Sequence, residues 1–280
     1  MRPIVIYHKN CADGFAAAWV FHRYFDAPID FHPGVYGEDP PDVTDRTVFL
    51  VDFSYPVEVV EEMARTAGRV VLIDHHVTAI NALKPLLDAG IIEGHISTEH
   101  SGAMLAWTYL HGEYKPPPVL LRHIEDRDLW RFAMQDTRAI QSAVFSYPYD
   151  FAVWDDLMSR DIESLVAEGK AIDRKHLKDI NELLPETKHR RVIGGYNVPA
   201  ANLPYIHASD AAHAMAKGEF FAACYFDTPT HRVFSLRSDG VVDVSQVAKQ
   251  YGGGGHKNAS GFRVPFGHVL AGPPMESFSE

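Results

Sequence analysis

Three short apolar runs in the first third of the chain predict buried, parallel β-strands. The runs cover residues 4–7, 47–51 and 69–73, and each is continuous instead of alternating with polar residues. Continuous apolar runs are typical of strands that are covered on both faces by helices. Segments with helical spacing, 15–24 and 56–66, separate the runs. This alternation predicts an α/β domain with a parallel sheet.

Each predicted strand is followed by residues that can bind a metal ion. In parallel sheets, ligands bind at the carboxyl ends of the strands. Imidazole and carboxylate groups that converge there can hold one or two divalent ions, and a shared carboxylate can bridge two ions. Asp52, at the end of the second run, is the candidate for that bridge. The strand-end residues are His8, Cys11 and Asp13, then Asp52, then Asp74, His75 and His76.

The middle of the chain predicts further helices and a helical connector. Helices are expected over 101–110 and 118–125, and the second leads into Asp126 and Asp128. Apolar residues recur at helical spacing over 156–184, and Pro185 is expected to end this segment. The basic stretch 188–191 then forms either a hinge or a solvated turn.

The last third predicts a second, smaller α/β domain. We expect a strand from Val192, a helix beginning near Ser209, strands over 220–226 and 232–236, and a helix over 244–251 before the glycine run 252–255. The chain then divides into a metal-binding catalytic domain at 1–150, a helical connector at 151–191 and a substrate-binding domain at 192–280. Residues 271–280 are expected to be poorly ordered, as chain ends often are.

Composition and charge restrict the class of protein. The chain has 280 residues, of which 46% are hydrophobic, which is enough for two compact domains. We expect a cytoplasmic protein without a membrane partner, because no signal-peptide pattern or membrane-length apolar stretch occurs and the two cysteines form no disulfide framework. A net charge of -11 argues against binding long duplex nucleic acid, which needs many Lys and Arg contacts. The oligomeric state is left open.

Five motifs occur in the order that is typical of one enzyme superfamily. They are His8-x-x-Cys11-x-Asp13-Gly14, strand-terminal Asp52, Asp74-His75-His76, Asp126-x-Asp128, and a glycine-rich motif from Gly252 to Phe262. With these motifs the sequence resembles the DHH phosphoesterase superfamily, with its associated C-terminal domain, over nearly the whole chain.

The resemblance implies two divalent ions and a role for each motif. His76 would face the substrate phosphate, and Asp74 is expected to orient a histidine, as residues behind metal ligands often do. The implied ligands of one ion are His8, Cys11 and Asp52, and those of the other are Asp13, Asp52, His75 and Asp126, with Asp128 as the alternative to Asp126.

Cys11 departs from the commonest form of the first motif, which has an aspartate at this position. Thiolate is a softer ligand than carboxylate, so it suits Fe²⁺, Co²⁺ or Zn²⁺, whereas Mn²⁺ prefers hard ligands. We expect Mn²⁺, with the softer ions as alternatives. Cys11 is either a ligand or a small buried residue without a ligand role.

The glycine run predicts a phosphate-binding loop in the second domain. Successive glycines let backbone N–H groups approach an anion, and a helix after the run would add a favourable dipole. The resemblance adds Arg237, since an arginine can bind phosphate with two hydrogen bonds. The expected substrate-binding residues are His76, Arg237, Gly253, Gly254, Gly255 and His256.

These features predict a metal-dependent phosphodiesterase. A water activated by two ions would attack phosphorus, while protein side chains neutralise charge on the phosphate oxygens. The expected catalytic residues are Asp52, His76 and His256. The expected substrate is a dinucleotide or a short single-stranded RNA that is cut from its 3′ end. The alternatives are an inorganic polyphosphate or pyrophosphate hydrolase and a nonenzymatic nucleotide-binding regulator.

Overall fold

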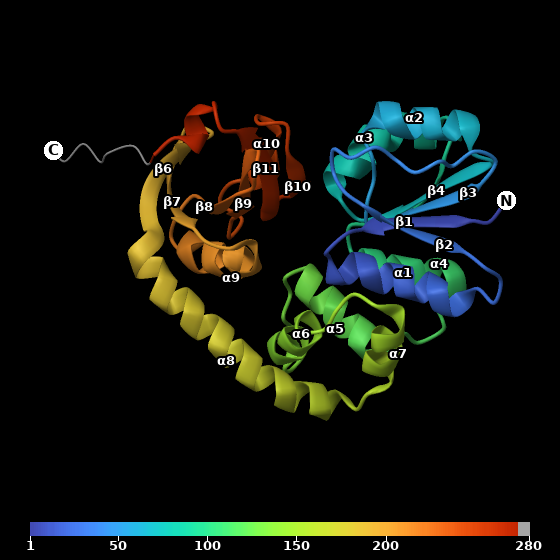
Figure 1. Cartoon of the computed structure of the whole chain (residues 1–280), viewed down its shortest axis with the longest axis horizontal. Helices are drawn as coiled ribbons and strands as arrows, with labels where there is room; N and C mark the ends of the chain where they lie inside the picture. Colours follow the sequence, from blue (N-terminus) through green and yellow to red (C-terminus); the bar gives the residue numbers. More distant parts are fainter. Residues whose placement is uncertain (274–280) are drawn as a thin grey trace. The chain divides into compact units, whose positions relative to one another are not determined.

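The computed structural model describes residues 1–273, and the chain forms two compact units (Figure 1). The first unit is Met1–Asp173 and the second begins at Arg174, within the long helix α8 (Ile162–Thr187). No helix of the described chain is both long and apolar enough to cross a membrane. Most of the C-terminal tail that was expected to be poorly ordered, 274–280, lies outside the described residues.

The first unit is built on a five-stranded, fully parallel sheet with the order β2-β1-β3-β4-β5. The three apolar runs are its central strands β1, β3 and β4. The chain leaves β1 for β2 on one side and later returns to β3 on the other, so the connections reverse direction between β1 and β3. In such sheets this switch point is where ligands bind. The strands are β1 (Ile4–His8), β2 (Asp30–Gly34), β3 (Thr47–Val51), β4 (Arg69–Asp74) and β5 (Glu93–Ile96).

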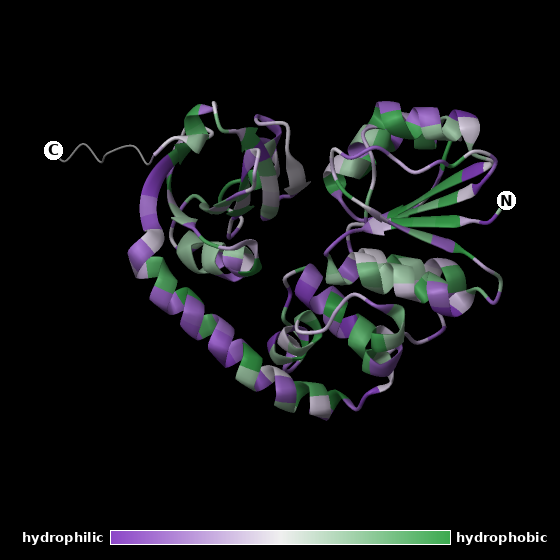
Figure 2. Cartoon of the chain, viewed as in Figure 1, coloured by the Kyte–Doolittle hydropathy of each residue, from purple (hydrophilic) through white to green (hydrophobic). Residues whose placement is uncertain are grey.

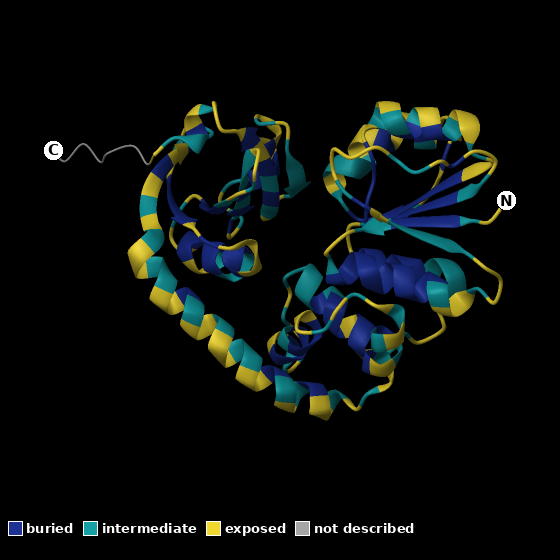
Figure 3. Cartoon of the chain, viewed as in Figure 1, coloured by how far each residue is buried: buried dark blue, intermediate teal, exposed yellow. Residues whose placement is uncertain are grey.

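Helices cover both faces of this sheet (Figure 1). Side chains alternate between the two faces of a strand, so each face has its own core. Val5, Val51 and Ile73 pack in one buried cluster, whereas Ile6 and Leu50 pack in another. The strands are the most hydrophobic part of the unit (Figure 2), and most of α1 is buried (Figure 3). The helices are α1 (Ala12–Tyr24) and α4 (Gly102–His111) on one face, and α2 (Val57–Thr66) and α3 (Val77–Asp88) on the other.

Three more helices extend the first unit beside α1 and α4: α5 (Val119–Asp128), α6 (Thr137–Phe145) and α7 (Phe151–Ser159). Trp154 of α7 is fully buried, and its ring lies 5.0 Å from that of Phe15 in α1. Part of the segment that was expected to be a connector therefore belongs to the core of the first unit.

The second unit is a six-stranded mixed sheet with helices on both faces. Its order is β10-β11-β9-β8-β7-β6, and among the described residues only β7 and β8 pair in parallel. α9 (Tyr205–Ala216) packs over Cys224, whereas α10 (Val244–Lys249) packs over Phe234 on the opposite face. A short 3-10 helix, Val269–Ala271, follows the sheet. The strands are β6 (Lys188–Ile193), β7 (Tyr196–Asn202), β8 (Ala222–Asp227), β9 (His231–Arg237), β10 (Gly254–His256) and β11 (Ala259–Pro265). The expected pair of α/β domains is confirmed.

Some expected boundaries were wrong. α8 continues through Pro185 to Thr187, because a proline near a helix end removes only one hydrogen bond. The stretch 188–191 is the start of strand β6, not a hinge or a turn. Buried Arg191 donates to the carbonyls of Leu270 and Gly272, contacts that the local sequence does not reveal. α1 begins at Ala12 and α9 at Tyr205, three and four residues earlier than expected.

Candidate metal centre

The candidate ligands of the first unit meet at the carboxyl edge of its sheet, at the switch point between β1 and β3. His8 ends β1, Asp52 directly follows β3, and Asp74 ends β4. Asp52 is buried and has a φ of 52°, a left-handed conformation that costs free energy for any residue except glycine. Backbone outliers of this kind cluster at functional sites, and this one directly follows β3 at the carboxyl edge of the sheet.

His75 is in the middle of one group of ligands. Its Nε2 atom lies 3.0 Å from Asp52 Oδ1, 3.5 Å from Asp128 Oδ2 and 3.9 Å from Asp13 Oδ2. Ligand atoms of Asp13, His75 and Asp128 all lie within 4.8 Å of one another. This spacing suits a single divalent cation.

A second group lies on the other side of Asp52. It consists of His8, Cys11 and Asp52, again with ligand atoms within 4.8 Å of one another. His8 Nδ1 lies 3.6 Å from Asp52 Oδ2, which is too long for a hydrogen bond. The two oxygens of Asp52 thus face different groups, Oδ1 toward His75 and Oδ2 toward His8. A carboxylate that bridges two ions needs this arrangement.

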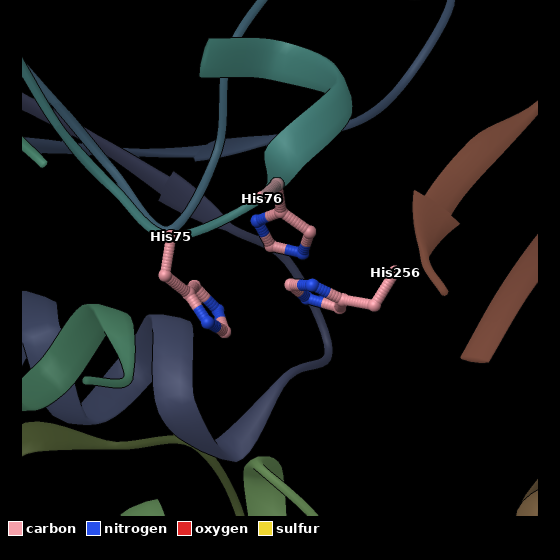
Figure 4. Close-up of side chains that lie close together, drawn as sticks. All are labelled: His75, His76 and His256. Atoms are coloured by element: carbon pink, nitrogen blue, oxygen red, sulfur yellow. The ribbon is translucent and has the colours of Figure 1, made fainter. Parts of the chain in front are cut away.

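Asp74 holds the connection between β4 and α3. Its Oδ1 atom accepts hydrogen bonds from the backbone N–H groups of His75 and His76, at 2.7 and 3.1 Å, and lies 2.7 Å from His76 Nδ1. The rings of His75 and His76 are 4.6 Å apart and inclined at 59° (Figure 4). Asp74 therefore orients His76, while His75 faces the carboxylates.

The N-terminus of α4 approaches the same carboxylates. The backbone N–H of Ala103 donates to Asp13 Oδ1 at 3.2 Å, and the positive end of a helix stabilises a nearby negative charge. A Cβ atom on Gly102 would lie 2.5 Å from Asp52 Cβ and 2.9 Å from Asp13 Oδ2, so this approach requires glycine. Sequence reasoning missed Gly102, although buried Ser101, which caps the helix, is the kind of signal that marks a helix start.

Burial and crowding shift the pKa values of the carboxyl and thiol groups. Burial, together with the charges of Asp128 and Asp52, raises the pKa of Asp13 well above its usual value. Burial raises the pKa of Asp128 as well. The pKa of the Cys11 thiol is raised mainly by burial and further by the charges of Asp52, Asp128 and Asp13. Divalent cations bound among these carboxylates would offset their mutual repulsion.

The histidines respond in the opposite direction. Burial acts to lower the pKa of His75, but its hydrogen bond to Asp52 and the charges of Asp128, Asp52 and Asp13 raise it to about 10. Burial likewise opposes the effect of Asp74, which raises the pKa of His76 to about 9. Burial also acts to raise the pKa of Asp52, yet hydrogen bonding to His75 and the nearby imidazoles of His8 and His76 lower it well below its usual value.

The buried atoms of the cluster fit a metal centre. Within residues 1–273, Asp13 Oδ2 and Asp52 Oδ2 have no hydrogen-bond partner although both are buried. A buried polar atom without a partner is costly unless it coordinates an ion or a water molecule. The donor set of imidazole, carboxylate and thiolate groups suits divalent transition metals.

The structure places Asp126 and Asp128 in different surroundings. α5 continues to Asp128, so both residues lie in its last turn, and two residues along a helix point in different directions. Asp126 accepts hydrogen bonds from the N–H groups of Ala133 and Met134, at 2.8 and 3.1 Å, and from Thr137 Oγ1 at 2.6 Å. Asp126 therefore fixes the loop after α5, and Asp128 is the residue beside His75.

The residues expected to bind substrate in the second unit lie at two strand ends. Arg237 ends β9, where its Nη2 atom donates to Ser209 Oγ at 2.7 Å and its Nη1 atom to the carbonyl of Leu236 at 2.8 Å. His256 is the last residue of β10 (Figure 4).

The expected loop-and-helix arrangement of the glycine run was wrong. Gly254 and Gly255 belong to strand β10, which pairs with β11 instead of leading into a helix. A Cβ atom on Gly253 would lie 2.1 Å from the carbonyl oxygen of Gly261, and one on Gly255 would lie 2.6 Å from that of Ala259. The close approach of these two strands requires both glycines, so their number gives no independent sign of a phosphate site.

Comparisons with known sequences find a related protein. No family model matches the sequence. The chain is 27% identical to an uncharacterized protein, R106 of Acanthamoeba polyphaga mimivirus, over 99% of this chain and 70% of that protein.

Two solved structures have a similar fold. One is PggH, a pGpG-specific phosphodiesterase of Vibrio cholerae, with 14% identity, a TM-score of 0.50, and 97% of this chain and 96% of that chain covered. The other is an exopolyphosphatase-related protein of Bacteroides fragilis, with 16% identity, a TM-score of 0.50, and coverage of 96% and 88%. At this identity the likeness establishes the fold.

Proposed function

We propose that this protein is a metal-dependent phosphodiesterase of the DHH phosphoesterase superfamily that hydrolyses dinucleotides or short oligoribonucleotides from the 3′ end. The observation that carries the proposal is the position of Asp52, whose two oxygens face two separate groups of ligand side chains. A carboxylate shared in this way is typical of two-metal phosphoesterase sites. The five ordered motifs and the fold shared with PggH support the same reaction.

The first unit offers ligands for two divalent ions. Bound at such a site, divalent ions lower the pKa of water and neutralise the charge of a phosphodiester. Mn²⁺ suits the carboxylates, and the sulfur of Cys11 makes Fe²⁺, Co²⁺ and Zn²⁺ reasonable alternatives. The residues that would hold the ions are His8, Cys11 and Asp52 on one side, and Asp13, Asp52, His75 and Asp128 on the other.

His76 is suited to bind the substrate phosphate. Asp74 contacts its Nδ1 atom and so fixes the direction of the ring. A histidine held in this way can donate from Nε2 to a phosphate oxygen and stabilise the negative charge that develops during the reaction. Asp74 acts through His76, as a positioning residue.

We further propose that the second unit binds substrate through Arg237 and His256. The contacts with Ser209 and Leu236 fix the orientation of the planar guanidinium group of Arg237, and a guanidinium group is suited to bind phosphate. Arg237→Ala and His256→Ala should each lower kcat/KM by a factor equivalent to about 1–3 kcal/mol of lost binding free energy, with unchanged metal binding. The loss should be greater for a dinucleotide than for a small generic phosphodiester. Equal losses on both substrates, or a loss of bound metal, would contradict this role.

The substrate class has one rival, inorganic polyphosphate or pyrophosphate. It is favoured by the fold shared with the exopolyphosphatase-related protein, which is as similar to this chain as PggH is. The net charge of -11 favours short substrates in either case, since long polyanions need many basic contacts.

A hydrolysis panel with added Mn²⁺ tests the proposal. The substrates are a dinucleotide, a five-nucleotide RNA, 3′-phosphoadenosine 5′-phosphate, pyrophosphate and polyphosphate, and the metal-site variants are Asp52→Ala and His75→Ala. We expect cleavage of the dinucleotide and the short RNA, and no cleavage by either variant. Cleavage of inorganic chains alone would favour the rival, and nucleotide binding without hydrolysis would indicate a regulator. Near-normal turnover by a variant would refute the two-metal site.

A further inference from the structure

Tyr36 presents a half-exposed aromatic ring beside the metal centre. The residue is 48% exposed. Its ring lies 5.4 Å from that of His8 at an angle of 71°, and 4.9 Å from that of Phe53 at 43°. His8 belongs to the ligand cluster and Phe53 directly follows Asp52, so Tyr36 contacts both sides of the switch point between β1 and β3.

The backbone around Tyr36 is fixed. Tyr36 is the second residue of a turn that is closed by a hydrogen bond of 3.1 Å from the N–H of Glu38 to the carbonyl of Val35. Gly37 follows with a φ of 86°, the value that the third position of a type II turn requires. The turn therefore sets the direction in which the Tyr36 side chain leaves the chain.

The Tyr36 ring packs against the buried ring of Phe53. Phe53 is fully buried, and its ring meets that of Tyr55 at 4.9 Å and 88°. A Cβ atom on Gly34 would lie 2.6 Å from the Phe53 ring, so a glycine at the end of β2 lets Phe53 occupy this position. Tyr36 thus rests on a packed aromatic base and loses little conformational freedom when a ligand covers it.

From this geometry we propose that Tyr36 is the stacking surface for a nucleobase of the substrate. This proposal rests on the proposed function, and it assigns a phosphodiester that carries a base as the substrate. Aromatic rings bind bases through their π-faces and tolerate any base sequence. The loop after Tyr36 carries the exposed carboxylates of Glu38, Asp39 and Asp42. These charges repel an inorganic polyphosphate chain, whereas an uncharged base can lie beside them.

Tyr24 provides a matched control. It is 45% exposed and also has two aromatic neighbours, Phe25 at 5.3 Å and His111 at 5.2 Å. It is the last residue of α1, whereas Cys11 of the metal centre immediately precedes that helix. Tyr24→Leu therefore removes a comparable ring at the far end of the same helix.

The experiment compares Tyr36→Leu, Tyr36→Phe and Tyr24→Leu on a dinucleotide and on the same dinucleotide with abasic sugars, with Mn²⁺ present. We expect Tyr36→Leu to lower kcat/KM for the dinucleotide by roughly 5- to 150-fold, mainly through KM, and to leave the abasic substrate and Mn²⁺ affinity unchanged. Tyr36→Phe should behave like the wild type, because Phe keeps the stacking ring. Tyr24→Leu should also behave like the wild type, because Tyr24 lies at the far end of α1 from the metal centre.

Four results would overturn the proposal. Equal losses on both substrates would show that Tyr36 only supports the site. A Tyr36→Phe variant as impaired as Tyr36→Leu would show that the hydroxyl group acts, not the ring. If the wild type cleaved only inorganic chains, the proposed function would fail together with the stacking role. If the wild type cleaved dinucleotides and Tyr36→Leu did so equally well, only the stacking role would fail.

Discussion

Asp126 and Asp128 lie two residues apart on one helix, and we predict opposite consequences for their replacement by asparagine. Asp126→Asn should destabilise the fold and preserve the metal centre. Asp128→Asn should preserve the fold and impair metal binding. The two variants have the same change in charge and size, so each is the control for the other.

The magnitude for Asp126 follows from its three hydrogen bonds, to the N–H groups of Ala133 and Met134 and to Thr137 Oγ1. An amide offers one acceptor oxygen, so its NH₂ group must face at least one of these donors. Losing a buried hydrogen bond to a charged group costs about 2–3 kcal/mol. For a unit of this size that lowers the Tm by about 4–12 °C.

The pH dependence has a definite sign. Burial acts to raise the pKa of Asp126, but the hydrogen bonds from Thr137, Ala133 and Met134 outweigh it and lower the pKa. A lowered pKa in the folded state means that the charged form stabilises the fold above the unfolded pKa of about 4, and that this contribution is lost as the pH falls through the folded value. The difference in stability between the wild type and Asp126→Asn should therefore shrink in acid.

The pKa of Asp128 is shifted in the opposite direction from that of Asp126. Burial and the charge of Asp52 raise the pKa of Asp128, although His75 acts against them. The charged Asp128 carboxylate therefore destabilises the fold when no metal is bound. Without metal, Asp128→Asn should be at least as stable as the wild type. It should lose most of the rise in Tm that Mn²⁺ produces, because an ion stabilises only the state that binds it.

Thermal unfolding of chelator-treated protein, with and without Mn²⁺ and at several pH values, measures both effects. Equilibrium dialysis then gives the amount of bound metal. A stable Asp126→Asn variant without a metal response, or an Asp128→Asn variant with a full response, would refute the assignment of the two residues.

Three further predictions concern the same cluster. Gly102→Ala should reduce Mn²⁺ affinity and activity more than tenfold, because its Cβ atom would collide with Asp52, whereas Gly68→Ala, whose nearest contact would be an ordinary 3.5 Å, should have no effect. Cys11→Asp should shift the activity profile toward Mn²⁺ over softer ions, and Cys11→Ala should weaken metal binding at one site. An unchanged metal titration for both variants would show that Cys11 only packs. Since the pKa of His75 is raised to about 10 without metal, ion binding at neutral pH must displace a proton, so calorimetry in buffers of different ionisation enthalpy should detect proton release and the affinity should rise with pH.

The sequence was sufficient to predict the central strands and the residues at their ends. Val48, Leu50 and Leu72 are buried in strands covered on both faces, so their runs are continuous and easy to recognise. The edge strands β2 and β5 gave no comparable signal. β2 reads Asp-Phe-His-Pro-Gly and is only partly buried, and β5 has a single apolar residue, Ile96. Their pairing comes from tertiary context.

The ambiguity between Asp126 and Asp128 in the sequence also has a physical origin. The apolar pattern of α5 weakens after Ile124, so the sequence gives no sign that the helix continues to Asp128. Once the helix is extended, the two carboxylates cannot face the same point. The donors that surround Asp126 come from the loop after the helix and from the start of α6. No local pattern shows which of two aspartates on a helix faces a distant strand end.

Backbone conformation and a glycine that is not itself a ligand determine whether the candidate ligands of this centre can approach one another. Asp52 adopts a φ of 52°, and in this conformation its two oxygens face His75 and His8. The N-terminus of α4 fills the space behind it, and only a glycine at position 102 leaves room for both Asp52 and Asp13. A strained backbone persists only where its surroundings hold it in place. Gly102 is therefore as necessary to the proposed bridge as the carboxylate, although no search for ligand residues would select it.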